Sequence, residues 1–116
     1  MFKLQDSLFR LEVFIMASRL ELQAKLEELL GSEQVYYQPP ESIKMSYPAI
    51  VYSKSRIETK KANNSTYSKR KRYEIIVISK LPDNPVIDKI MELPYCSYDR
   101  HYKSDGLNHD SLILYY

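Results

Sequence analysis

A chain of 116 residues is long enough for one domain with a modest core and too short for two. Hydrophobic residues make up 44% of it and charged residues 28%, a balance that excludes an intrinsically disordered chain. The net charge of +2 conceals an uneven distribution: residues 54–72 carry eight Lys or Arg against one Glu, a local +7, and the segments before and after sum to −2 and −3.

The first 15 residues form an apolar stretch that charged residues interrupt. Asp6, Arg10 and Glu12 break it and no small-residue cleavage site follows, so the stretch does not have the pattern of a secretory signal. No apolar run in the chain approaches the about 18 residues that a membrane span needs. We predict that residues 1–15 are an N-terminal extension from an upstream start codon; the alternative is an earlier helical turn.

The domain proper is predicted to cover residues 16–116 and to open with a helix over 18–30. Ser18 followed by Glu21 has the pattern of a capping box, and Gly31 has the position of a C′ residue. Leucine and isoleucine recur at helical spacing up to the end of this segment, which indicates an amphipathic helix. The stripe consists of Leu4, Leu8, Leu11, Ile15, Leu22, Leu26 and Leu29.

Three strands are predicted in the next part of the chain. The first, over 35–38, ends at two prolines, which lack an N–H, so it must stop there or lie at a sheet edge. A second strand is predicted over 49–57 and a third over 72–79, where four consecutive β-branched residues strongly favour a strand. With Asn63-Asn64 as a turn signal, the last two form a long hairpin whose tip carries the basic excess.

The remaining segment predicts one short helix and a second hairpin. Val86, Ile87, Ile90 and Met91 have helical spacing between turn prolines. Strands are predicted over 95–103 and 109–116, joined by a turn that contains Asp-Gly, a strong hairpin signal. The predicted fold is therefore α+β: an antiparallel sheet of about four strands, with the N-terminal helix and the short helix packed on one face.

Six side chains with possible chemistry crowd into residues 96–110, but their spacing does not define a site. There is no C-x-x-C, no H-E-x-x-H and no calcium-loop pattern. His101 and His109 lie on opposite arms of the last hairpin, so they could approach each other, but no third ligand is assured. Nothing fixes Cys96 beside either histidine. We predict no metal, no cofactor and no enzymatic activity.

Cysteine and tyrosine contents bear on location and assembly. Because Cys96 is the single cysteine, an internal disulfide is excluded and a reducing compartment is indicated. The chain has 11 Tyr against 3 Phe and no Trp, and a large ring with a polar hydroxyl suits surfaces that become buried on assembly, although some rings fill cores. The candidate interface aromatics are Tyr36, Tyr37, Tyr67, Tyr98 and Tyr102.

The basic hairpin, residues 54–72, is the strongest candidate for a functional surface. It could contact phosphates, pair with acidic faces of neighbouring subunits, or remain solvated and serve only solubility. No reading helix accompanies it, so base-specific recognition is not expected. Its candidate residues are Lys54, Arg56, Lys60, Lys61, Lys69, Arg70, Lys71 and Arg72.

Three segments carry a resemblance to a known family. They are VYYQPPESIKMSYPAIVY at 35–52, KRYEIIVI at 71–78 and LPYCSYDRHYKSDGLNHD at 93–110. Together they resemble the small tail terminator proteins, also called tail completion or head–tail joining proteins, of long-tailed bacteriophages and prophages of Gram-positive hosts. The resemblance covers about residues 16–116, and none of its residues marks a chemical mechanism.

The resemblance implies a structural protein of the virion, assembled in the host cytoplasm. Such a protein forms a ring, usually of six copies, that caps the tail tube and joins it to the head–tail connector proteins. Non-specific contact with phage DNA in the channel is a further possibility that it leaves open. A small nucleic-acid-binding module that uses residues 54–72 is the alternative function.

Overall fold

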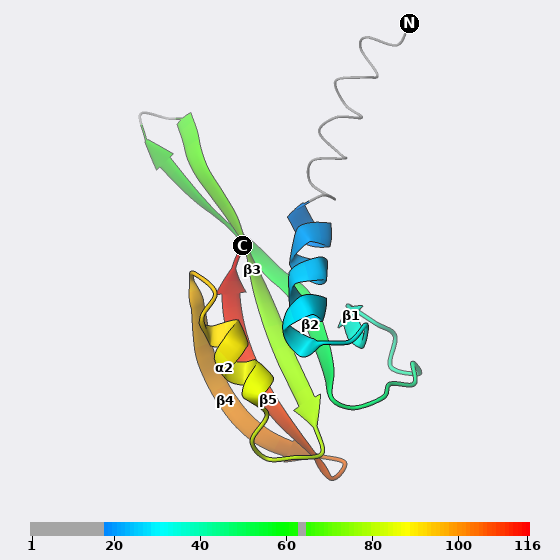
Figure 1. Cartoon of the computed structure of the whole chain (residues 1–116). Helices are drawn as coiled ribbons and strands as arrows, with labels where there is room; N and C mark the ends of the chain where they lie inside the picture. The colour runs from blue at the N-terminus through cyan, green and yellow to red at the C-terminus, as the bar shows by residue number, and fades with distance from the viewer. Residues whose placement is uncertain (1–17, 63–64) are drawn as a thin grey trace, which may run out of the picture.

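The computed structural model describes residues 18–62 and 65–116, without the side chains of residues 56–70. Two helices and a five-stranded sheet make up this part of the chain, and both helices lie on the same face of the sheet (Figure 1). The first helix covers residues 18–30 of the described chain. The other elements are β1 (Val35–Tyr37), β2 (Ala49–Ala62), β3 (Ser65–Ser79), α2 (Pro85–Met91), β4 (Cys96–Ser104) and β5 (Leu107–Tyr115).

The first helix ends where the sequence predicts. The N–H of Gly31 donates to the carbonyl oxygen of Glu27 at 2.8 Å, and Gly31 has a φ of +79°. This left-handed conformation is typical of a C′ glycine, because a residue without Cβ adopts it at no steric cost. Leu22 and Leu26, one turn apart, are both fully buried and fix the helix to the sheet.

The α+β class is confirmed, but two details of the predicted sheet are wrong. The sheet has five strands in the order β1-β2-β3-β5-β4, and it is mixed, since β1 runs parallel to β2 with Val35 opposite Ile50. The long connection over 38–48 is the reason, because it carries the chain back to the end of the sheet at which β1 began. The other three strand pairs are antiparallel, as predicted.

The long hairpin of β2 and β3 extends well beyond the rest of the sheet (Figure 1). β1 pairs only with residues 50–52 of β2. The ladder between β5 and β3 stops at Arg72, followed by two backbone hydrogen bonds between Lys71 and Tyr116. Beyond Lys71 the described residues of β2 and β3 pair only with each other, so the outer part of the basic hairpin forms a two-stranded ribbon. Its predicted turn at Asn63-Asn64 lies outside the described residues.

Local signals also place the second hairpin and the short helix. Asp105 and Gly106 both have positive φ values, +54° and +76°, as a two-residue type I′ turn requires. At the start of α2 the side chain of Asn84 accepts a hydrogen bond from the N–H of Val86 at 3.0 Å, and Pro85 occupies the first helical turn. Both elements match their predictions.

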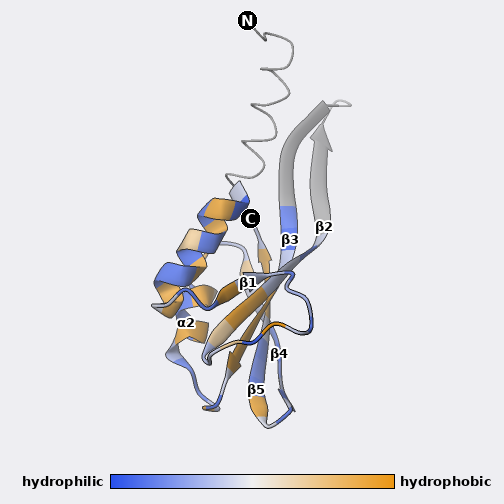
Figure 2. Cartoon of the chain, turned by 90° about the vertical axis from the view of Figure 1, so that its right-hand side faces the viewer, coloured by the Kyte–Doolittle hydropathy of each residue, from blue (hydrophilic) through white to orange (hydrophobic). Residues whose placement is uncertain are grey.

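The core lies between the sheet and the two helices. Alternate residues of the strands point to this side, and they include two large aromatic rings, Tyr52 and Tyr73, each 1% exposed. Figure 2 shows the helices on one side of the sheet only. The opposite side, which we call the uncovered face, has no second layer in the described chain. The buried core consists of Leu22, Leu26, Val35, Ile50, Tyr52, Tyr73, Ile75, Val77, Val86, Ile90, Leu112 and Leu114.

The buried phenol of Tyr73 predicts a loss of stability at alkaline pH. Burial, with the nearby Tyr37 and Tyr52, raises the pKa of Tyr73 from 10.0 to about 12. The folded chain therefore holds this proton more tightly than the unfolded chain. Its contribution to the free energy of unfolding is complete below pH 10 and is lost as the pH rises through about 12. The pKa of Tyr73 differs by about 2 between the folded and the unfolded chain, which corresponds to about 2–3 kcal/mol of unfolding free energy.

We expect Tyr73→Phe to raise the pH midpoint of alkaline unfolding, measured by circular dichroism. Tyr47→Phe, which changes a partly exposed ring, should leave this midpoint unchanged. An equal midpoint for both variants would contradict the prediction.

Candidate functional site

The structure describes the side chains at the base of the basic hairpin, where β2 and β3 leave the rest of the sheet. Lys54 is exposed, and Lys71 and Arg72 are half-buried where the ribbon leaves the sheet. An irregularity in the β2–β3 register brings Ser55 beside Arg72: the guanidinium Nη1 donates to Ser55 Oγ at 2.8 Å, and this hydroxyl donates to the Arg72 carbonyl oxygen at 3.0 Å. The other predicted residues occupy paired strand positions, but their side chains lie outside the described part. They are Arg56, Lys60, Lys61, Lys69 and Arg70.

The candidate interface tyrosines divide between the two faces of the sheet. Tyr36, opposite Val51, is on the uncovered face. Tyr37 is on the helix side, where its ring lies 4.9 Å from the ring of Tyr52 and 4.5 Å from the guanidinium of Arg19. Tyr37 therefore packs against residues of its own chain. The side chain of Tyr67 lies outside the described residues.

Tyr102 is part of a stack on the uncovered face. The Tyr102 ring lies 4.9 Å from the His109 ring, at an interplanar angle of 18°. The guanidinium of Arg100 lies 4.9 Å from the centre of the Tyr102 ring. A cation over an aromatic ring is attracted by the negative charge of the ring face. The stack thus places a positive group at the β4 side of the uncovered face.

The fifth candidate, Tyr98, belongs to a polar cluster on the helix side. Its hydroxyl donates to Asp110 Oδ1 at 2.7 Å, and His101 Nδ1 lies 2.9 Å from the same oxygen. The hydrogen bond to the carboxylate raises the pKa of Tyr98 to about 12. Asp110 itself is only 6% exposed, so the cluster supplies the polar partners that a buried carboxylate requires.

A β-bulge in β4 assembles this cluster. The register shifts between Tyr98 and Arg100, so Tyr98 pairs with Leu112 and His101 with Asp110. Without the shift, residues 98 and 101 would point to opposite faces of the sheet, because side chains alternate along a strand. Sequence reasoning missed the cluster, since a bulge at Asp99 has no clear signal in the sequence.

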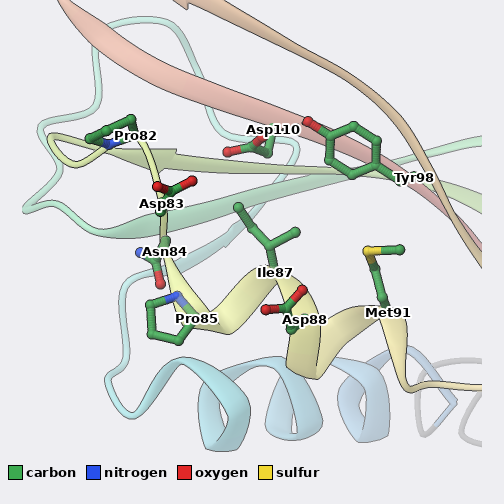
Figure 3. Close-up of a pocket in the computed structure, with 9 residues that line it drawn as sticks. All are labelled: Pro82, Asp83, Asn84, Pro85, Ile87, Asp88, Met91, Tyr98 and Asp110. Atoms are coloured by element: carbon green, nitrogen blue, oxygen red, sulfur yellow. Dashed lines mark hydrogen bonds between the residues drawn. The ribbon is translucent and has the colours of Figure 1, made fainter.

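The cluster borders a pocket between α2 and the β4–β5 hairpin (Figure 3). Its volume is about 480 Å³, and its lining combines apolar side chains, among them Ile87 and Met91, with the carboxylates of Asp83, Asp88 and Asp110. An imidazole oriented by a carboxylate resembles part of a catalytic triad. Among the described residues that line the pocket there is no serine, threonine or cysteine, the usual nucleophiles of such a triad.

The expectation that His101 and His109 could approach each other is wrong. In the β4–β5 register His101 is opposite Asp110, and His109 is opposite Tyr102, so the two imidazoles point to opposite faces of the sheet. Within residues 18–62 and 65–116 no group of three potential metal ligands occurs. Cys96 is half-buried against the core, and burial raises the pKa of its thiol, which disfavours the reactive thiolate.

The two edges of the sheet body are poor sites for adding a further strand. β1 has only three residues and is followed by two prolines, and the outer edge of β4 carries the bulge and the charged Asp99 and Arg100. Short edges, bulges and charges are the usual devices that prevent edge-to-edge pairing. Pairing of a further strand with either of these two edges is therefore disfavoured.

Comparisons with known proteins give no family assignment. No protein-family model matches the chain, and no curated protein matches it significantly. Among the described residues no helix combines the length and the apolar character needed to cross a bilayer.

Proposed function

We propose that this chain is a structural subunit of a bacteriophage tail, which forms a ring that caps the tail tube and joins it to the head–tail connector. The observation that supports the proposal is the basic hairpin: residues 54–72 carry a local charge of +7, and their outer part extends beyond the rest of the sheet as a two-stranded ribbon. The resemblance of residues 35–52, 71–78 and 93–110 to tail terminator proteins supports the same function.

The charge of the ribbon restricts what can surround it. Burying an unpaired Lys or Arg costs several kcal/mol per ion, so these side chains must end in water, at acidic groups of another chain, or at phosphates. A ring requires heterologous contacts, in which one patch meets a different patch of the next copy. A chain that is basic in one segment and acidic on both sides of it can supply such a pair.

A nucleic-acid-binding module is the second candidate function. The same +7 segment favours it, because phosphate contacts through Lys and Arg need no further motif. The affinity of such a module for DNA would fall steeply with salt concentration, and the protein would bind DNA as a monomer or small oligomer.

The mass of the assembly in solution and on tail tubes tests the proposed function. We expect a closed ring, of six copies by the resemblance, in light scattering or particle images, either for the free protein or at the end of a tail tube. A protein that stays monomeric at high concentration and within finished tails would overturn the proposal.

A further inference from the structure

The central strand β3 is apolar on both sides. Ile75 and Val77 are fully buried under the helices, whereas Ile76 and Ile78 point to the uncovered face. A continuous apolar run is typical of a strand that is covered on both faces, while a strand with one solvated face alternates apolar and polar residues. The described chain supplies a layer for one face only (Figure 2).

The uncovered face carries apolar and polar side chains side by side on its central strands. Ile76 is opposite Val51 on β2 and opposite Ser111 on β5, and Ile113 is opposite Glu74. Val51, Ile76 and Ile113 are half-buried within the single chain. Exposed apolar side chains with polar neighbours are typical of protein interaction sites. The charged residues on this face are Arg72, Glu74 and Arg100, a sum of +1.

The outer surface of the helical layer has complementary properties. Leu20 on the first helix is 50% exposed, and Met91 on α2 is 43% exposed. The exposed charged residues of the two helices, together with the C-cap residue of α2, are four acids and two bases, a sum of −2. They are Glu21, Lys25, Glu28, Asp88, Lys89 and Glu92.

We propose that the uncovered face of one copy packs against the helical layer of the next copy. This inference rests on the proposed ring and names two surfaces that form part of the contact between copies, in addition to the basic hairpin. Opposite net charges favour this pairing, whereas two uncovered faces against each other would place Arg72 and Arg100 of both copies in one interface. Because the two surfaces differ, each copy can add another in the same direction until the ring closes.

Cross-linking between introduced cysteines tests this geometry. In a Cys96→Ser background, Val51→Cys places a thiol on the uncovered face, and Ala24→Cys places one on the exposed side of the first helix. With a flexible bis-maleimide, we expect the variant with both thiols to give a ladder of linked chains up to the ring size. Each single-thiol variant should give only monomer, and a mixture of the two should give dimers and nothing larger.

Other cross-linking patterns would overturn the inference. Dimers from the Val51→Cys variant alone would show that two uncovered faces pack on each other. Absence of the ladder in rings whose mass is normal would overturn this contact but leave the proposed ring intact, whereas absence of rings would remove the proposed function itself. A ladder that appears only after residues 1–15 are deleted would show that this segment covers the face instead.

A charge at the centre of the uncovered face gives an independent test. We expect Ile76→Lys to abolish ring formation, because the lysine would be buried without a partner in the interface. Circular dichroism and a urea midpoint establish whether the variant monomer is still folded. Ile43→Lys, in the connection between β1 and β2, is the matched control and should assemble normally. A folded Ile76→Lys variant that forms normal rings would contradict the inference.

Discussion

Neutralising the tip of the basic hairpin is expected to abolish ring assembly while the subunit remains folded. The variant carries four Gln substitutions, at Lys60, Lys61, Lys69 and Arg70. Its subunit should keep its stability, because none of the core residues that the structure describes belongs to residues 54–72. Loss of four positive charges would remove the attraction to acidic groups of the next copy. Sedimentation or light scattering at several salt concentrations measures the effect, and tail length and infectivity report it in the virion.

Salt provides a second readout of the same contact. Exposed ion pairs are screened within about 8 Å at physiological ionic strength, so unmodified rings should also weaken as salt rises. A control removes positive charge outside the hairpin and outside the two proposed contact surfaces, and it should assemble normally. It replaces three exposed lysines with Gln: Lys44, Lys80 and Lys103.

The outcome for the particle distinguishes the three interpretations of the hairpin. Failed assembly identifies a contact between subunits, which is the result that we expect. Normal rings and tails combined with poor genome retention would identify a contact with DNA in the channel. Intact and fully infectious particles would show that the charges serve only solubility, and would contradict the expectation.

Truncation of Leu26 to Ala should strongly destabilise the subunit. Leu26 is fully buried between the first helix and the sheet, and its removal would leave a cavity that the surrounding side chains fill only in part. Leucine-to-alanine changes in cores cost about 2–5 kcal/mol, a large part of the about 5–15 kcal/mol that holds a small domain folded. The urea midpoint measures the loss.

The neighbouring position provides the control for this prediction. Lys25 is exposed on the same helix, and Lys25→Ala removes only a 4.0 Å contact with Glu28 at the surface. Such exposed pairs contribute little to stability, so the midpoint should hardly move. Similar losses for the two variants would mean that the first helix does not pack on the sheet as described.

Patterns that act over a few residues determined much of the fold from the sequence. Gly31 ends the first helix and Asp105-Gly106 turns the last hairpin, because both need positive φ values that local chemistry alone specifies. The run at 75–78 similarly identified the central strand, and charge counting located the basic hairpin. Each of these signals is contained within one short segment of the chain.

Features that depend on pairing between distant segments were decided only by the tertiary structure. The parallel placement of β1 required the return of the chain through 38–48, and the cluster around Asp110 required a bulge in β4. Neither can be read from spacing, because register is set by how two strands pack together, and a shift of one residue moves a side chain to the other face. For the same reason only the three-dimensional arrangement revealed that Ile76 and Ile78 lie on the face of the sheet opposite the two helices (Figure 2).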